Sequence, residues 1–167
     1  MKILSALLVA ALAFAATPAF AARACYTPDQ MRAEQLLRLH SELMVVAITC
    51  RQGSRGQDLP AAYVDFTKHN IGILHGAEQT MIGYYRTHDR GDPTSHLDRL
   101  RTLLGNEFGQ ESADMSAPAF CAAFRDDVVK YDAASRADID NAVTHMEVAD
   151  RSYEPLCGSK ATEVAKR

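Results

Sequence analysis

Apolar residues recur every three or four positions along most of the chain, which is the spacing of one buried face of an α-helix. The first such stretch begins at Thr27, which can cap a helix, with Pro28 at the first helical position and Gln30 placed to complete a capping box. It ends near Cys50, because Gly53 and a polar loop follow. We therefore expect a long core helix with an apolar face made of Leu36, Leu37, Leu39, Leu43, Met44, Val46 and Ile48.

A second helical stretch begins near Asp58, a cap residue that precedes a proline in the first turn. Asn70, Gly72 and Gly76 interrupt its apolar pattern. Because glycine destabilises a helix interior, we expect a kink or a break between residues 69 and 73. The residues expected to face inward are Tyr63, Phe66, Leu74, Met81 and Tyr85.

Three further helices have similar starts. Asp92 and Pro93 begin the first of them, and the next follows Ser116, with Pro118 in its first turn. The last begins at Ser135. The expected buried positions are Leu97, Leu100, Leu103, Leu104 and Phe108, then Phe120, Phe124, Val128 and Tyr131, then Ile139, Val143 and Met146.

No segment alternates apolar and polar residues over the length of a strand, so the sequence predicts an all-α fold. Short connections make successive helices antiparallel neighbours, as in an up-and-down bundle of four to five helices. The length fits a single domain over residues 22–158. A polar tail, residues 159–167, is expected to be mobile.

The first residues have the pattern of a secretory signal peptide. Lys2 precedes an apolar run that ends at Ala16, and Ala19 to Ala21 form an A-x-A cleavage site. We expect residues 1–21 to be removed and the mature protein to be periplasmic or secreted. The alternative is an uncleaved membrane anchor, but the alanine-rich run is shorter than the roughly 20 strongly apolar residues that a membrane span needs.

An even number of cysteines in an exported chain indicates disulfides. None of the cysteines lies in a C-x-x-C pair, which argues against a thioredoxin-like motif, a zinc knuckle and a covalently attached haem. The expected disulfide residues are Cys25, Cys50, Cys121 and Cys157.

Helix geometry restricts how these cysteines pair. Cys25 and Cys50 lie at opposite ends of the first helix, roughly 35 Å apart, whereas a disulfide joins α-carbons about 4.4 to 6.8 Å apart. In an up-and-down order Cys121 lies beside Cys50, which leaves Cys25 to pair with Cys157. If the second helical stretch instead reverses direction near Gly72, Cys121 meets Cys25.

The segments ELMVVAITC, YYRTH, LDRLRTLLGNE and FCAAF combine apolar helical faces with a particular placement of the cysteines. Over roughly residues 25–131 this pattern resembles a family of small, uncharacterised secreted or periplasmic proteins of Gram-negative bacteria, with two disulfides and no assigned activity. The resemblance implies an exported helical protein and no particular activity.

The net charge of -3 at pH 7 provides no basic surface for nucleic acid or for an anionic membrane. The sequence has none of the common catalytic motifs, such as G-x-S-x-G, H-E-x-x-H or a phosphate-binding loop. We therefore expect a protein that is not an enzyme, with no catalytic residue and no resident cofactor, which binds or supports an unknown periplasmic protein or a small ligand.

Histidines supply the alternative, which is a carrier of zinc, copper or haem. The loop before the third helical stretch contains four possible ligands of zinc or copper, namely His88, Asp89, Asp92 and His96. Their spacing matches no compact metal motif. A solvated loop in which Asp92 caps the next helix explains the same residues without a metal.

Two residue pairs offer further possible ligands. His40 and Met44 lie four residues apart on one helix face and could bind copper, although Met44 also fits the core. Met31 and His145, on the first and last helices, could hold a haem without covalent attachment, as in bundles that resemble cytochrome b562. Ordinary helix packing explains Met31 without haem, since bundles often hold methionine in their cores.

Export of the full chain can be tested directly. Expressed in a Gram-negative host, the protein is expected in the periplasmic fraction with Ala22 as its first residue, because a signal peptidase removes residues 1–21. Intact-mass spectrometry measures where the chain begins. In the control variant Leu8→Arg a charge interrupts the apolar run, so the unprocessed chain stays in the cytoplasm. Periplasmic protein that retains residues 1–21 would contradict the prediction.

Overall fold

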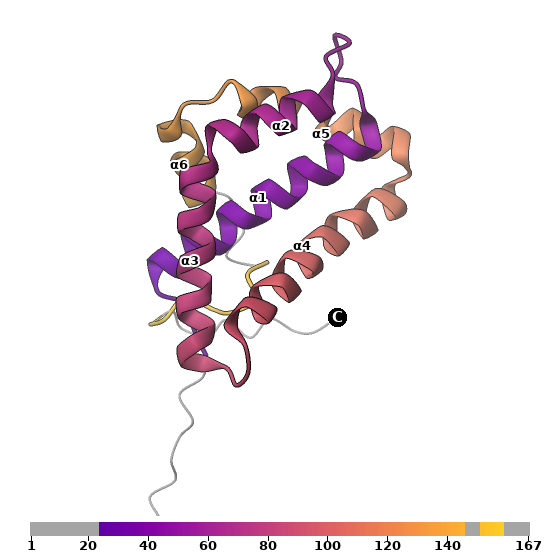
Figure 1. Cartoon of the computed structure of the whole chain (residues 1–167). Helices are drawn as coiled ribbons and strands as arrows, with labels where there is room; N and C mark the ends of the chain where they lie inside the picture. Colours follow the sequence, from indigo (N-terminus) through magenta and orange to yellow (C-terminus); the bar gives the residue numbers. More distant parts are fainter. Residues whose placement is uncertain (1–23, 146–150, 159–167) are drawn as a thin grey trace, which may run out of the picture.

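The structure is a computed structural model that describes residues 24–145 and 151–158. The expected signal peptide, Met146 and the polar tail 159–167 lie outside these residues. The described residues form six α-helices and only isolated β-bridges, so the predicted all-α fold is confirmed. The helices are α1 (Pro28–Cys50), α2 (Leu59–His69), α3 (Ile71–His88), α4 (Pro93–Met115), α5 (Ala117–Asp132) and α6 (Arg136–His145) (Figure 1).

Helix α1 is the central element and crosses the middle of the molecule in Figure 1. The predicted capping box fixes its start: the Thr27 amide donates to Gln30 Oε1 at 2.8 Å, and the Gln30 amide donates to Thr27 Oγ1 at 3.3 Å. Helix α1 contacts each of the other described helices. Leu39, Leu43 and Val46 are almost completely buried, and each such side chain stabilises the fold by about 1.5 to 3 kcal/mol.

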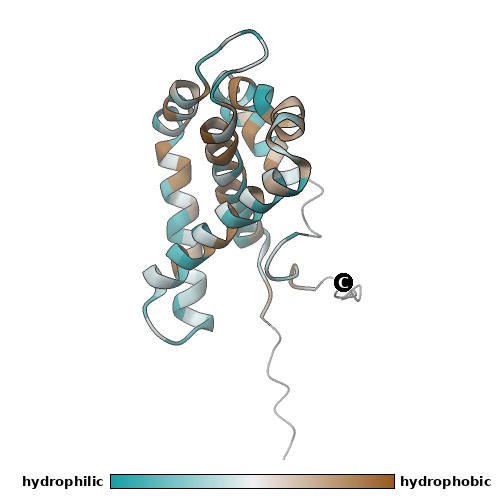
Figure 2. Cartoon of the chain, turned by 90° about the vertical axis from the view of Figure 1, so that its right-hand side faces the viewer, coloured by the Kyte–Doolittle hydropathy of each residue, from teal (hydrophilic) through white to brown (hydrophobic). Residues whose placement is uncertain are grey.

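Two residues that the sequence predicts in the core are exposed instead. The side chain of Ile48 is 65% exposed, because no other helix covers this side of the last turn of α1. Leu103 is 43% exposed and lies at the rim of a small cavity beside the end of α3. Elsewhere the apolar segments gather where the helices face one another, as Figure 2 shows.

The predicted interruption of the second helical stretch is a break at Asn70, which separates α2 from α3. The Asn70 side chain donates to the Phe66 carbonyl at 2.9 Å, and such local hydrogen bonds compete with a continuing helix. After the break, α3 turns away from α2 and packs against α1 and α4 (Figure 1). The expectation of four to five helices is therefore too low, although the helix packing is compatible with a bundle.

Both predicted disulfides are confirmed. Cys50 at the end of α1 pairs with Cys121 near the start of α5, with α-carbons 5.4 Å apart, and Cys25 pairs with Cys157 at 5.0 Å. The alternative pairing of Cys25 with Cys121 is wrong, because the break at Asn70 turns the chain without reversing it (Figure 1). Cys50 and Cys121 are 71 positions apart, and in the chain-entropy model closing the loop between them stabilises the fold by about 4 kcal/mol.

A charged side chain, Arg38, is buried in the middle of α1 with only 1% of its surface exposed. Its guanidinium forms ion pairs with Glu34 at 3.1 Å and with Glu107 of α4 at 2.6 Å. It also donates to the backbone carbonyl of Arg151 at 2.7 Å. These contacts link α1, α4 and residues 151–158 in one network.

Residues 151–158 form a segment that covers this network. The fully buried Glu34 carboxylate accepts hydrogen bonds from the Ser152 hydroxyl at 3.1 Å and from the Tyr153 amide at 3.3 Å. Further along, the segment pairs with the start of the described chain, where the Tyr26 amide donates to a carbonyl of the segment at 2.8 Å. The Cys25–Cys157 disulfide completes the attachment.

The variant Arg38→Met tests the importance of the buried network. It retains most of the side-chain length but leaves the Glu34 carboxylate buried without its cation, so the free energy of unfolding is expected to fall by about 3 to 5 kcal/mol. Urea denaturation followed by circular dichroism measures the change. The matched control Arg90→Met alters an exposed loop residue and is expected to change the free energy by less than about 0.5 kcal/mol. An equally small change for Arg38→Met would contradict the prediction.

Candidate functional site

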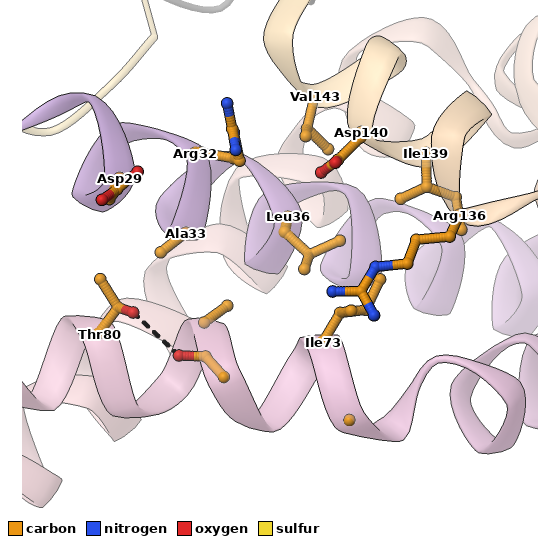
Figure 3. Close-up of a pocket in the computed structure, with 13 residues that line it drawn as sticks. Asp29, Arg32, Ala33, Leu36, Ile73, Thr80, Arg136, Ile139, Asp140 and Val143 are labelled. Atoms are coloured by element: carbon orange, nitrogen blue, oxygen red, sulfur yellow. Dashed lines mark hydrogen bonds between the residues drawn. The ribbon is translucent and has the colours of Figure 1, made fainter.

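A groove with a volume of about 370 Å³ opens between α1, α3 and α6 (Figure 3). Helix α1 packs against both α3 and α6, so it connects the two helices that form the sides of the groove. The floor is apolar and consists of Ala33, Leu36, Ile73, Ala77, Ile139 and Val143. We call this cavity the α1/α3/α6 groove.

Two glycines of α3 leave space for the groove. Gly72 and Gly76 lie one helical turn apart, and both line it. A Cβ atom added at either position would meet no other atom within 4 Å. Glycine inside a helix is less stable than alanine by roughly 0.5 to 1 kcal/mol. The two glycines therefore weaken α3 at positions where no close contact requires them.

Four charged side chains surround the apolar floor. Asp29 and Arg32 come from α1, and Arg136 and Asp140 come from α6. All four residues are exposed, and within the described chain none of them forms an ion pair. Figure 3 shows Arg136 reaching from α6 toward Ile73 of α3. The groove thus combines an apolar surface with free charges of both signs.

The predicted ligands of the loop between α3 and α4 make separate contacts. The His88 ring stacks on Tyr84 with ring centroids 4.3 Å apart, and its Nδ1 lies 2.9 Å from the Tyr84 carbonyl oxygen. Asp92 caps α4 by accepting from the amides that follow it. Only Asp89 and His96 come together, with 3.6 Å between the carboxylate and Nδ1. The structure therefore does not gather these residues around one point.

His40 is held by α2. Its Nε2 lies 2.9 Å from the Tyr63 hydroxyl and 3.1 Å from Thr67 Oγ1, so the ring nitrogen already has polar partners. Burial lowers the pKa of His40 from 6.5 to about 4, and the positive charge of Arg101 contributes. The partner proposed for it, Met44, is half-buried, and its methyl group lies beside α4. Neutral His40 thus serves as a packed hydrogen-bonding group.

For the predicted haem pair the structure describes one side chain. Met31 is half-buried on α1, and its sulfur lies 3.6 Å from Gln35 Nε2. His145 is the last residue of α6, and its side chain lies outside the described part of the structure. The methionine therefore has a packing role that requires no haem.

Carboxylates gather on another face of α1. Burial, followed by the negative charges of Asp127 and Glu111, raises the pKa of Glu42 from 4.5 to about 7. The negative charge of Glu42 is thus disfavoured in the folded state, which makes this residue a source of pH dependence.

Among the described residues, no group of three or more His, Cys, Asp or Glu side chains is placed to hold a metal ion.

The sequence contained a partial signal for the groove. Gly72 and Gly76 are visible as glycines one turn apart in a helical pattern, but the pattern predicts a weak helix and not a cavity. The sequence gives no indication of the charged residues around the groove. Arg32 and Arg136 lie more than a hundred positions apart and look like ordinary surface residues.

Comparison of the chain with protein families, curated proteins and solved structures finds no match. The resemblance to a family of small secreted proteins therefore stays a prediction. The function must be inferred from the groove and its chemistry.

The low pKa of His40 predicts a loss of stability in acid. The unfolded chain takes up a proton near pH 6.5 and the folded chain only near pH 4, so the folded state is destabilised as the pH falls through this range. Urea denaturation between pH 7 and pH 4 should show the stability of wild type falling by about 2 kcal/mol relative to His40→Gln. The comparison cancels the opposing effect of Glu42. His75→Gln, at an exposed histidine, is the control, and an equal difference for both variants would contradict the prediction.

Proposed function

We propose that the mature chain is an exported, non-enzymatic helical domain that binds a small amphipathic ligand in the α1/α3/α6 groove. The observation that carries the proposal is the open groove, which Gly72 and Gly76 of α3 line without contributing side chains. Its volume of about 370 Å³ falls in the range typical of small-molecule sites. The sequence supports the non-enzymatic part of the proposal, because it has none of the common catalytic motifs.

The lining of the groove favours a ligand with two kinds of surface. An apolar body fits the floor, where its removal from water provides the main gain in free energy. A polar head group can then approach Arg32 and Arg136, whose guanidinium groups suit a carboxylate or a phosphate. Asp29 and Asp140 add sites for an amino group on the same ligand. We therefore place small zwitterionic or anionic amphiphiles first among its ligands.

The disulfides support the proposed location. Two disulfides and no free cysteine fit an oxidising compartment, such as the periplasm or the outside of the cell. Among the described helices, none is long and apolar enough to cross a membrane. The signal peptide and the periplasmic location follow from the sequence and belong to the proposal.

A variant that fills the groove tests the proposed function. Gly76→Leu places a large side chain in the groove without a clash at Cβ, and it removes a helix-weakening glycine. The variant is expected to fold at least as stably as wild type and to bind the fluorescent probe anilinonaphthalene sulfonate at least about tenfold more weakly. Fluorescence titration measures binding, and decanoate should displace the probe from wild type.

The control Gly109→Leu makes the same change at an exposed glycine of α4, where an added Cβ also meets no atom within 4 Å. It should bind the probe as wild type does. If Gly76→Leu and Gly109→Leu bind the probe equally, the groove is not the binding site. If wild type binds neither the probe nor decanoate, the proposed ligand class is wrong.

A further inference from the structure

The two ends of the α1/α3/α6 groove carry opposite charges. Figure 3 shows Asp29 of α1 opposite Thr80 of α3 at one end. At the other end Leu36 of α1 lies opposite Ile73 of α3, and Arg136 reaches toward them from the first turn of α6. We call these the Asp29 end and the Arg136 end of the groove.

The other two charged side chains favour neither end. Arg32 and Asp140 come from α1 and α6, and Figure 3 shows both on the side of the groove away from α3. Because their charges have opposite signs, they largely offset each other for a charged group on the floor. The Arg136 side chain, in contrast, extends toward α3 (Figure 3). The difference between the two ends therefore depends on Arg136 and Asp29.

Only the Arg136 end suits a carboxylate. At the Asp29 end the Thr80 hydroxyl donates to the Gly76 carbonyl at 3.0 Å, so its proton already has an acceptor (Figure 3). The Asp29 carboxylate repels a second negative charge there. At the opposite end, the Arg136 guanidinium forms no ion pair with a described residue and can hold a carboxylate.

The floor of the groove limits the length of an apolar chain. The α3 residues that line it run from Gly72 to Thr80. At a rise of 1.5 Å per residue this stretch is roughly 12 Å long, which matches an extended chain of roughly ten carbon atoms. Carbon atoms beyond this length would pass the Asp29 end and remain in water.

We propose that the ligand of the groove is a medium-chain carboxylate, with its carboxylate at the Arg136 end and its chain directed toward the Asp29 end. This inference rests on the proposed function of the groove and narrows its ligands to one class. The chain lies along Gly72 and Gly76, where the absence of side chains allows it to approach the α3 backbone. Attraction by Arg136 and repulsion by Asp29 favour the same orientation.

A series of carboxylates tests the chain length. Isothermal titration calorimetry of the mature protein, with each ligand below its micelle concentration, measures the affinities. From hexanoate to decanoate the affinity is expected to rise by about twofold to threefold per methylene, because an open groove removes part of each methylene from water. Dodecanoate should match decanoate within about twofold. A rise that continues unchanged to dodecanoate would contradict the proposed length.

The variant Arg136→Glu tests the position of the carboxylate. A glutamate in the first turn of α6 suits the helix dipole, so the variant is expected to fold. It should bind decanoate about fivefold to tenfold more weakly than wild type and decylamine about threefold more tightly, because the charge at this end is reversed. The control Arg90→Glu makes the same change at an exposed loop residue outside the groove and should leave both affinities unchanged.

The variant Asp29→Asn tests the orientation. With the carboxylate at the Arg136 end, Asp29 is roughly one Debye length away, so the affinity for decanoate should change by less than about twofold. In the reverse orientation, loss of the adjacent negative charge would strengthen binding by about threefold or more. Such an increase shows that the proposed orientation is wrong.

The groove-filling variant Gly76→Leu separates this inference from the proposed function. If decanoate binds wild type but not Gly76→Leu, while Arg136→Glu behaves as Arg90→Glu does, the groove binds amphiphiles and the inference about Arg136 is wrong. If decanoate binds wild type and Gly76→Leu equally, or binds neither, the proposed function is wrong and the inference fails with it.

Discussion

A guanidinium group that is removed from water must be matched by negative or polar partners, and this requirement of Arg38 determines how one end of the molecule is built. Its partners come from α1, from α4 and from residues 151–158, which are distant in sequence. None of the three parts can move away alone without isolating a buried charge. The network therefore also holds Tyr153 and Glu154 beside the small cavity at the end of α3.

The features that the sequence predicted well are those that depend on neighbouring residues. The capping box of Thr27 and Gln30 is complete within three residues, and the break near Asn70 follows from the residues around it. The length of α1 excluded one pairing of the cysteines, and the up-and-down order of the helices favoured the observed pairs over a Cys25–Cys121 bond. The burial of Arg38 was not predictable, because its partners Glu107 and Arg151 lie far along the chain and a charged residue normally predicts an exposed position.

The candidate sites were less predictable than the fold, and the reason is physical. The sequence predicts possible metal ligands in the histidine-containing loop, but a ring nitrogen of His88 and one of His96 each lie 2.9 Å from a nearby backbone carbonyl oxygen. The groove exists because α6 and α3 stand apart on α1, and this separation depends on the whole set of helix contacts. The sequence predicts that Gly72 and Gly76 weaken the helix, whereas the groove that they line exists only in the folded state.

The Cys25–Cys157 disulfide has a mechanical consequence. Both residues lie outside the described helices, one before α1 and one after α6, so all of these helices belong to a single covalent ring. Tension applied to the chain on the two sides of this ring passes through the sulfur–sulfur bond and does not load the helices. The two residues at which the chain enters and leaves the ring therefore stay close together, with their α-carbons 5.0 Å apart.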